Sequence, residues 1–318
     1  MINIAINGFG RIGRAFFKVA AKQKDIHIKY ISDIKDSNNL IYLLEHDSLL
    51  GRFNLRMKEK TIIIEGKESF FLDSMHGENP KFNDIDIVVE SSGAFLNFKA
   101  LKSHLLRGAR KVILTAPFLE LPTYIIGVNE NLYKNEKIIS NASCSANAIA
   151  PIIKTINNKY KIISGNSTTI HPFNSNQSIL DNPNPLGARF SRNASLNIIP
   201  SKSSIGEIIG LLFADLRGKF LGDSIRVPTS LVSFSNIDLV LEKNIIKDDI
   251  LNLNFPKIIG LDSKYLVSSD FIGDSRSAII ASDLVSVHDN ICRIPVWFDN
   301  ENAYANRLLD MVRIMHKS

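Results

Sequence analysis

Short apolar, β-branched segments alternate with helical stretches along the first third of the chain. This alternation is typical of a parallel sheet covered by helices. Strands are predicted at residues 3–7, 27–32, 85–90, 111–114, 124–127 and 137–140. Helices are predicted at residues 11–22, 38–45 and 98–106, with a hairpin inserted at 54–72.

The pattern changes after Ser145. A helix is predicted at residues 146–157, and longer alternating segments with few helices between them follow it. Long strands of this kind favour a mixed or antiparallel sheet, and hence a second domain of different architecture. The segments are residues 162–171, 224–242, 265–269 and 277–287, and a final helix is predicted at 301–316.

A polar stretch at residues 174–197 lies among these segments and contains Asn182-Pro183-Asn184-Pro185. It is long for a loop within a compact domain, and such long loops are commonly functional. The sequence leaves two interpretations open, a functional loop or a packing arm.

A glycine-rich segment, Gly8-Phe9-Gly10-Arg11-Ile12-Gly13, follows the first predicted strand and opens the first predicted helix. The glycines permit a tight turn and close backbone approach, and the start of the helix can hold a pyrophosphate. Asp33 lies 20 residues beyond, at the end of the second predicted strand, where its carboxylate can accept ribose hydroxyls. Glycines in an ordinary turn are the alternative, but strand, helix and Asp33 in register predict a dinucleotide site. Because the Asp33 carboxylate would repel a 2′-phosphate, NAD is favoured over NADP.

Size and composition indicate an ordinary globular chain. Its 318 residues correspond to about two domains. With 45% hydrophobic and 22% charged residues, neither a disordered nor a membrane protein is favoured. No apolar run reaches the ~18 residues that cross a bilayer, and the start of the chain lacks the features of a signal peptide. The net charge of +6 suits an anionic ligand, but without a basic block of residues nucleic acid is not expected.

Cysteine and histidine are sparse. The two cysteines, Cys144 and Cys292, cannot form a disulfide framework and lie in no Cys-x-x-Cys pair. The seven histidines show no metal-binding spacing, so no metal site is predicted. We therefore expect a reducing, cytoplasmic compartment.

Cys144 lies in Ser143-Cys144-Ser145, between a predicted strand and the start of a predicted helix. The helix dipole and free backbone amides at such a position are expected to lower the pKa of the thiol and permit attack near neutral pH. A lone cysteine is also often a small buried apolar residue. His171, at the end of a predicted strand, is likewise either a base or a structural histidine, and spacing alone does not bring it to Cys144.

Further motifs occur in order along the whole chain and resemble those of the glyceraldehyde-3-phosphate dehydrogenase family, which includes erythrose-4-phosphate dehydrogenase. Eight ordered motifs make chance agreement negligible. They are Asn7-Gly8-Phe9-Gly10-Arg11-Ile12-Gly13-Arg14, Glu90-Ser91-Ser92-Gly93, Thr115-Ala116-Pro117, Gly127-Val128-Asn129, Ser140-Asn141-Ala142-Ser143-Cys144, Asn197-Ile198-Ile199-Pro200, Arg226-Val227-Pro228 and Trp297-Phe298-Asp299-Asn300-Glu301.

The resemblance implies an NAD-linked oxidation of an aldehyde by a thiol. Cys144 would be the nucleophile and His171 the general base, Asn300 would fix the nicotinamide carboxamide, and Arg226 would bind phosphate. Tyr304 would pack near the nicotinamide, although a role in the core is nearly as well supported. The implied cofactor-binding residues are Gly8, Gly10, Arg11, Ile12, Gly13, Asp33, Ser92, Thr115, Asn300 and Tyr304. The implied substrate- and phosphate-binding residues are Ser143, Ser145, Asn174, Asn176, Ser203, Ser204 and Arg226.

The departures from the family concentrate on phosphate binding. Asn174 and Asn176 stand where the family has threonines, and both can still donate hydrogen bonds. Phe190 stands where an arginine supports the attacking phosphate, with Arg189, Arg192 and Lys202 as possible substitutes. Ser204 stands where a glycine lets backbone amides approach an anion. The oxidation step is therefore better supported than the phosphorylation step.

Three hypotheses follow. The first is a phosphorylating glyceraldehyde-3-phosphate dehydrogenase, which uses a small phosphorylated aldehyde and inorganic phosphate. The second is a dehydrogenase of erythrose 4-phosphate or another phospho-aldehyde, with water resolving the thioester. The third is a catalytically reduced NAD-binding homologue with an interaction role.

The expected architecture is α/β, with a Rossmann-type doubly wound parallel sheet and an α+β catalytic domain whose mixed sheet is largely antiparallel. Residues 1–143 and 301–318 would form the NAD-binding domain, and residues 144–300 the catalytic domain. The resemblance also implies a homotetramer, in which the polar loop packs against a neighbouring subunit.

Overall fold

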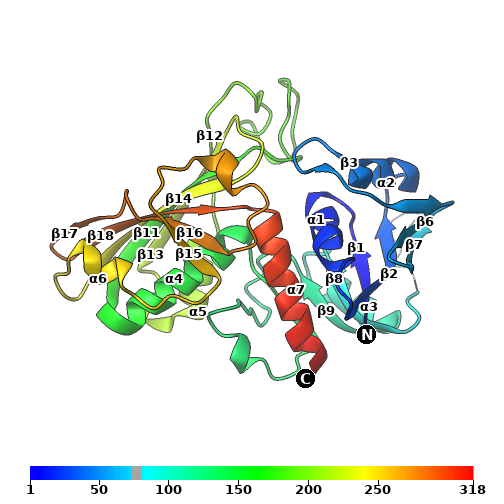
Figure 1. Cartoon of the computed structure of the whole chain (residues 1–318), viewed down its shortest axis with the longest axis horizontal. Coiled ribbons are helices and arrows are strands. Elements are labelled where there is room, and N and C mark those ends of the chain that lie inside the picture. The colour runs from blue at the N-terminus through cyan, green and yellow to red at the C-terminus, as the bar shows by residue number, and fades with distance from the viewer. Residues whose placement is uncertain (74–80, 318) are drawn as a thin grey trace. The chain divides into compact units, whose positions relative to one another are not determined.

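The computed structural model describes residues 1–73 and 81–317 (Figure 1). Contacts divide the chain into two compact units. Unit 1 comprises Met1–Ser143 and Ala305–Ser318, and unit 2 comprises Cys144–Tyr304.

Unit 1 is built on a sheet of eight described strands in the order β10-β9-β8-β1-β2-β7-β6-β5. The strands from β10 to β7 in this order are parallel, whereas β6 and β5 continue antiparallel at one edge. The bounds are β1 Ile2–Asn7, β2 Ile26–Asp33, β5 Arg56–Lys58, β6 Thr61–Ile64, β7 Lys67–Asp73, β8 Ile85–Glu90, β9 Ala109–Leu114 and β10 Ile138–Ser140. A separate small hairpin pairs β3 (His46–Asp47) with β4 (Gly51–Arg52).

The strand order of this sheet reverses between β1 and β8. From β1 the chain adds β2 and β7 on one side, and β8, β9 and β10 on the other. In open parallel sheets, ligands bind at the carboxyl ends of the strands where the order reverses. Here those ends are Asn7 and Glu90, which are paired in register.

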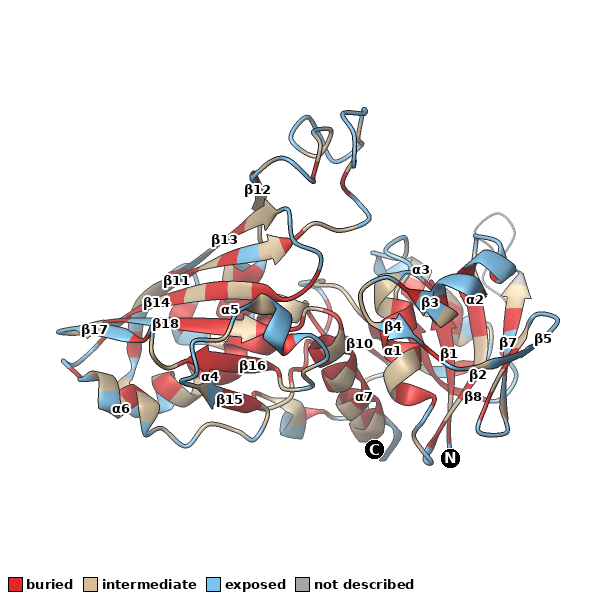
Figure 2. Cartoon of the chain, turned by 45° about the horizontal axis from the view of Figure 1, so that its top comes forward, coloured by how far each residue is buried: buried red, intermediate tan, exposed pale blue. Residues whose placement is uncertain are grey.

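Helices and a continuous apolar core support the sheet of unit 1. The helices are α1 Arg11–Ala20, α2 Ser37–Glu45, α3 Phe98–Leu106 and α7 Asn302–Lys317. Phe9 lies edge-on against Phe17 and Phe71, with ring centroids 5.6 and 5.5 Å apart. Leu308 and Val312 of α7 belong to the same buried cluster. Figure 2 shows buried residues along the central strands of this sheet and of the sheet in unit 2.

Unit 2 contains a mixed sheet in the order β12-β13-β11-β14-β18-β16-β15, with β17 paired to β18. Its described pairs are antiparallel except for β11 with β13 and β15 with β16. The strand bounds are β11 Ile162–Pro172, β12 Ile199–Lys202, β13 Phe220–Val227, β14 Ser233–Leu241, β15 Ile259–Asp262, β16 Ala278–Ala281, β17 Ser286–His288 and β18 Ile291–Phe298. The helices are α4 Cys144–Tyr160, α5 Ile205–Leu212 and α6 Lys247–Leu251. The predicted fold class, a parallel doubly wound sheet with a mixed, largely antiparallel second sheet, is confirmed.

Several local predictions were wrong. Residues 124–127 form no strand. Tyr124 N still donates to Ser140 O of β10 at 3.1 Å, but the Asn129 side chain accepts from Ile125 N at 2.9 Å and donates to Thr123 O at 2.8 Å, and the chain turns from residue 126. Residues 265–269 form no strand, and a 3₁₀ turn occupies Ser268–Phe271. The segment predicted at 224–242 is two strands, β13 and β14, with a turn between them. The predicted hairpin at 54–72 is a three-stranded meander whose last strand joins the parallel sheet.

Membrane-spanning helices and metal-binding clusters are both absent from the described ranges. Within residues 1–73 and 81–317, no helix combines the length and apolar character needed to cross a membrane. In the same ranges, no group of three or more His, Cys, Asp or Glu side chains is arranged to hold a metal ion.

Candidate active site

Three chemically active side chains meet in unit 2. Cys144 is the first residue of α4, His171 lies near the end of β11, and Arg226 lies near the end of β13. Because β11 and β13 are parallel neighbours, their register places His171 directly opposite Arg226. The Cys144 Sγ lies 3.8 Å from His171 Nε2. The fold therefore brings together the thiol and imidazole that sequence spacing alone could not join.

The backbone just before Cys144 is strained. Ala142 has a φ of 54°, a left-handed conformation that L residues rarely adopt. Its backbone N donates to Ser140 Oγ at 3.0 Å, and Asn141 Nδ2 donates to Tyr124 O at 2.9 Å. Strain of this kind persists where surrounding contacts over-determine it, and it is concentrated at functional sites.

The other ring nitrogen of His171 is held by its surroundings. Nδ1 lies 2.8 Å from the Pro172 carbonyl oxygen and in close contact with the Arg226 guanidinium, which itself donates to Pro172 O at 3.2 Å. The guanidinium can only donate, so its contact requires an unprotonated Nδ1, whereas the Pro172 carbonyl requires a protonated one. When Nδ1 carries the proton and donates to Pro172 O, Nε2 is left with a lone pair that faces the thiol. That tautomer is the one a general base requires.

Burial dominates the charge state of the cysteine. Burial raises the pKa of the Cys144 thiol above its ordinary value, although Arg226 and a hydrogen bond with Ser145 lower it. The prediction of a lowered thiol pKa was therefore wrong. The start of α4 does supply favourable groups, but the loss of solvation outweighs them.

The pKa of the His171 imidazole is shifted in the opposite direction, downward. Burial and the positive charge of Arg226 lower the pKa of His171 to about 3, against a smaller opposing effect of the Pro172 carbonyl. At neutral pH the site thus holds a neutral thiol beside a neutral imidazole. Such a pair can transfer its proton from Sγ to Nε2 when an electrophile reaches the sulfur.

Asn300 and Tyr304 belong to unit 2, as do Cys144 and His171. Asn300 Oδ1 is buried and has no hydrogen-bond partner among the described residues. An amide N–H, such as that of a nicotinamide carboxamide, would satisfy this oxygen, and the site fits the cofactor in this respect. Tyr304 is only 3% exposed, and burial, followed by the charge of Cys144, raises the pKa of its phenol well above the ordinary value.

Asp299 fixes the backbone around Asn300. Its carboxylate is fully buried and accepts hydrogen bonds from the backbone N of Gly273, Glu301 and Asn302 at 2.8, 2.9 and 2.8 Å. The sequence motif contained Asp299 without suggesting a role for it. The available signal was a charged residue directly after the apolar residues 294–298.

The glycines of unit 1 have different roles. Gly8 has a φ of +91°, and a Cβ on it would overlap the backbone of Ser91 and Ser92. A Cβ on Gly13 would overlap the Gly8 carbonyl, whereas nothing lies within 4 Å of a Cβ built on Gly10. The open space at Gly10, before the first turn of α1, fits the close approach of a pyrophosphate.

Asp33 is held beside this glycine turn. Its Oδ2 accepts from Phe9 N at 2.6 Å, and its Oδ1 accepts from Lys35 N at 2.9 Å. Each carboxylate oxygen can accept a further bond, so ribose hydroxyls can still be bound. The structure therefore brings Asp33 and the glycine segment together, as the sequence predicted.

The remaining predicted cofactor residues lie in the same unit. Arg11 contacts the Asp47 carboxylate at 3.3 Å, and the half-buried Ile12 follows it on α1. The Ser92 hydroxyl donates to the Glu90 carboxylate at 2.5 Å, and the Thr115 hydroxyl donates to the Glu90 carbonyl at 3.0 Å. Glu90, which joins both residues, belongs to a sequence motif that suggested no role for it.

The open space at Gly10 gives a direct prediction. Gly10→Ala meets no neighbouring atom and requires no left-handed backbone, so the thermal midpoint should stay unchanged. The added methyl occupies the space proposed for the pyrophosphate, and the Kd for NAD should rise about tenfold, equivalent to about 1.4 kcal/mol. Calorimetric titration with NAD and a thermal melt on the same sample would check both. Unchanged NAD affinity would place the pyrophosphate elsewhere.

The predicted phosphate-binding residues are only partly brought together. Ser145 forms a hydrogen bond with Cys144, and Ser143 precedes it in the same turn. The side chains of the other predicted residues form local bonds: Asn174 Oδ1 accepts from Asn176 N at 3.1 Å, and Ser203 Oγ accepts from Ile205 N at 3.3 Å. Ser204 caps α5 with a φ of −88°, so a side chain at the family's glycine position causes no backbone strain.

The possible substitutes for the missing arginine are solvent-exposed. Arg192 Nε donates to Asp181 at 3.1 Å, and both side chains are more than half exposed. Arg189 and Lys202 are exposed as well, while Phe190 is half-buried. The Arg192–Asp181 pair would have to open before Arg192 could bind a phosphate.

Comparisons with known proteins show which family the chain belongs to. The family model described as "Glyceraldehyde 3-phosphate dehydrogenase, NAD binding domain" matches residues 2–98, and the one described as "Glyceraldehyde 3-phosphate dehydrogenase, C-terminal domain" matches residues 143–300. Glyceraldehyde-3-phosphate dehydrogenase of Helicobacter pylori is 38% identical, with 99% of each chain covered. That of Phytophthora infestans is 37% identical over the whole of both chains, and glyceraldehyde-3-phosphate dehydrogenase A of Escherichia coli is 34% identical, with 99% of each covered. The chain therefore belongs to the glyceraldehyde-3-phosphate dehydrogenase family.

Proposed function

We propose that this chain oxidises glyceraldehyde 3-phosphate with NAD through a thioester on Cys144, and that inorganic phosphate releases the product as 1,3-bisphosphoglycerate. As a member of its family, it is an NAD-dependent oxidoreductase that acts on an aldehyde group. The observation that carries the proposed mechanism is the 3.8 Å separation of Cys144 Sγ and His171 Nε2, with Arg226 opposite the imidazole.

The first step is nucleophilic addition. Sγ forms a bond to the aldehyde carbon as its proton passes to His171 Nε2, and the imidazolium then gives that proton to the carbonyl oxygen, which yields a hemithioacetal and a neutral His171. His171 is suited to this step because it is unprotonated at neutral pH. The Cys144 thiol therefore need not be ionised before the aldehyde arrives.

The second and third steps complete the oxidation and the release. Bound NAD supplies the hydride acceptor. His171 removes the hydroxyl proton of the hemithioacetal, and the carbon that loses the hydride becomes the acyl carbon of the thioester. An oxygen of inorganic phosphate then attacks that carbon, and the Cys144 sulfur leaves.

Arg226 links substrate binding to the strength of the base. A phosphate dianion at its guanidinium would offset the positive charge that helps to lower the pKa of His171. The pKa of His171 should then rise from about 3 toward its ordinary range. The imidazole thus becomes a stronger base when a phosphorylated substrate is present.

The proposed NAD site uses the residues described above. Gly8, Gly10 and Gly13 would form the pyrophosphate turn, and Asp33 would accept the ribose hydroxyls. Asn300 would accept a hydrogen bond from the nicotinamide carboxamide through its unpartnered Oδ1. In this proposal unit 1 is the NAD-binding domain and unit 2 the catalytic domain.

The two other hypotheses are not favoured. Curated relatives from several species carry the name glyceraldehyde-3-phosphate dehydrogenase and align along the full chain. A catalytically reduced homologue also fits poorly with the close approach of Cys144 and His171.

Steady-state NADH formation tests the proposal. Glyceraldehyde 3-phosphate and erythrose 4-phosphate would each be assayed with and without inorganic phosphate. We expect the highest rate with glyceraldehyde 3-phosphate and a strong, saturable increase with phosphate. A rate that phosphate does not change would show that water resolves the thioester, and a preference for erythrose 4-phosphate would overturn the proposed substrate.

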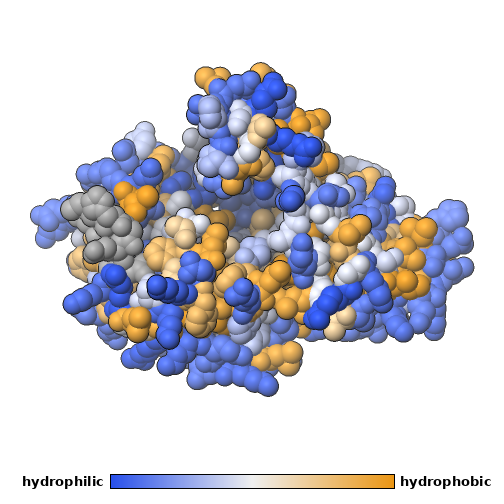
Figure 3. All heavy atoms as spheres, turned by 180° about the vertical axis from the view of Figure 1, so that it is seen from behind, coloured by the Kyte–Doolittle hydropathy of each residue, from blue (hydrophilic) through white to orange (hydrophobic). Residues whose placement is uncertain are grey.

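We also propose a cytoplasmic homotetramer, by family resemblance. The segment at residues 174–197, at the top of Figure 3, carries apolar side chains that are more than half exposed in the single chain, namely Ile179, Leu180, Leu186 and Leu196. Association would remove such surface from water. Both cysteines are free, in keeping with a reducing compartment, and sedimentation equilibrium would determine the number of chains.

A further inference from the structure

A fully buried carboxylate lies where the strand order of unit 1 reverses. Glu90 is the last residue of β8, is 0% exposed, and pairs in register with Asn7, the last residue of β1. The turns that follow these two strands carry Gly8 and Ser92. Both residues belong to the proposed NAD site, so the position of Glu90 bears on cofactor binding.

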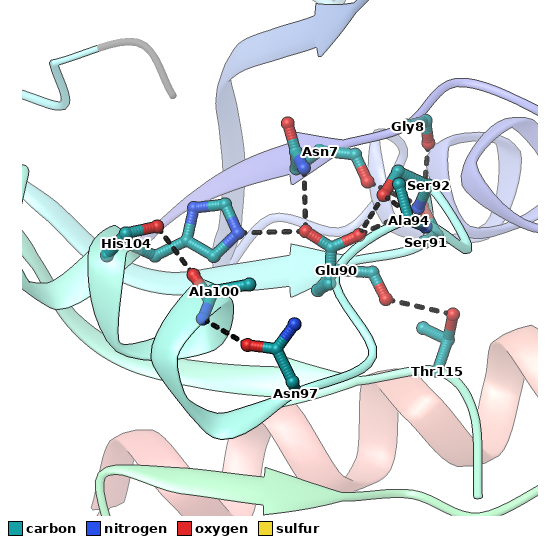
Figure 4. Close-up of polar contacts among 11 residues, drawn as sticks. Asn7, Gly8, Glu90, Ser91, Ser92, Ala94, Asn97, Ala100, His104 and Thr115 are labelled. Carbon is teal, nitrogen blue, oxygen red and sulfur yellow. Dashed lines mark hydrogen bonds and ion pairs between the residues drawn. The ribbon is translucent and has the colours of Figure 1, made fainter. Parts of the chain in front are cut away.

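Four donors from three elements converge on the Glu90 side chain (Figure 4). Oε2 accepts from Asn7 Nδ2 at 2.6 Å and from His104 Nε2 at 2.8 Å. Oε1 accepts from the backbone N and the hydroxyl of Ser92 at 2.8 and 2.5 Å. Each oxygen therefore has two donors, which compensates for the cost of burying the charge.

The same contacts reach the glycine turn. Ser91 Oγ donates to the Gly8 carbonyl at 2.7 Å, and Ser91 N donates to the Asn7 carbonyl at 2.8 Å. Gly8 packs so closely on the backbone of Ser91 and Ser92 that no Cβ would fit. A displacement of the turn after β8 would therefore displace the glycine turn as well.

His104 completes the arrangement from α3. The ring is 0% exposed and lies beside Phe95 and Phe82, with centroids 5.2 and 6.0 Å away. Its Nε2 bonds to Glu90, whereas its Nδ1 is buried without a hydrogen-bond partner among the described residues. A buried nitrogen without a partner costs stability, and an apolar side chain would fill the space without that cost. The benefit of a histidine here is thus the bond that it gives to Glu90.

We propose that His104 and Glu90 are positioning residues, which hold the turns after β1 and β8 in the conformation that binds NAD. Turns fixed in advance need not be ordered when the cofactor binds, and affinity rises accordingly. The inference depends on NAD as the cofactor and not on the chemistry at Cys144. A direct binding measurement therefore tests it separately from the proposed reaction.

The test compares the Kd for NAD of the full chain and three variants by calorimetric titration. His104→Leu removes the donor to Glu90, and we expect binding about tenfold weaker, with kcat at saturating NAD within about twofold of the unmodified protein. His104→Gln keeps an amide N–H of similar reach and should restore most of the affinity. Leu101→Ala is the matched control, because Leu101 is a fully buried apolar residue of the same helix.

Leu101→Ala should lower the thermal midpoint and leave the Kd for NAD unchanged. Two results would overturn the inference. One is a Kd for NAD in His104→Leu that equals that of the unmodified protein. The other is a rise of the Kd in Leu101→Ala as large as in His104→Leu, with an equal fall of the thermal midpoint in the two variants. If His104→Leu does not fold, His104→Asn replaces it, because its shorter amide falls short of Glu90. If the proposed reaction through Cys144 is wrong, the comparison of Kd values for NAD still tests this inference.

Discussion

Cys144→Ala is expected to reduce NADH formation from glyceraldehyde 3-phosphate by a factor on the order of 10⁴ or more, because it removes the sulfur that would carry the thioester beside His171. The affinity for NAD should not change, since the glycine turn and Asp33 lie in unit 1. Steady-state kinetics and calorimetric titration with NAD would measure the two effects on one preparation.

Cys292→Ala is the matched control. Cys292 is a fully buried residue of β18, and burial raises the pKa of its thiol to about 12. Its loss should lower stability slightly and leave kcat within about twofold, because no step uses it. Retention of a tenth of the activity in Cys144→Ala would exclude Cys144 as the nucleophile.

Arg226→Gln is expected to lower kcat/KM for glyceraldehyde 3-phosphate about 100-fold, equivalent to about 3 kcal/mol, through loss of a charge-assisted contact with the substrate phosphate. Unphosphorylated glyceraldehyde lacks that contact, so its kcat/KM should fall much less. Assays with both aldehydes would separate phosphate binding from a general disturbance of the site.

The same variant should change the pKa values of His171 and Cys144. Removal of the guanidinium charge raises the pKa of His171, although burial still keeps it below the ordinary value. It also removes an influence that lowers the pKa of Cys144, so alkylation by iodoacetamide at pH 7 should slow. Arg293→Gln is the control, because Arg293 is an exposed partner of Asp238.

The aldehyde assays decide the role of Arg226. An equal loss of kcat/KM in Arg226→Gln with glyceraldehyde 3-phosphate and with glyceraldehyde would contradict a phosphate-binding role.

The sequence pattern was most informative where neighbouring residues in the chain alone determine a helix or strand. β8 and α3 have the bounds that were predicted from their apolar spacing. The two strands β13 and β14 were read as one segment, because their alternation continues on both sides of the turn near Pro228. The strand predicted at 124–127 is interrupted by contacts of the Asn129 side chain, and propensity does not reveal such contacts.

Within the candidate site, too, the sequence identified some residues, whereas other features depend on the folded chain. Motifs identified Cys144, His171 and Arg226, but their approach results from the parallel register of β11 with β13 and from the turn before α4. The raised pKa of Cys144 depends on burial, which only the folded chain determines. Glu90 and His104 are 14 residues apart and were missed, because their bond exists only after α3 packs on the sheet.

Mass spectrometry of the chain, after mixing with NAD and glyceraldehyde 3-phosphate in the absence of inorganic phosphate, tests the central claim most directly. We predict one equivalent of NADH per chain, an acyl group attached to Cys144, and renewed turnover when phosphate is added. Continuous NADH formation without phosphate, or an unmodified Cys144 after the first turnover, would contradict a phosphorylating mechanism through this residue.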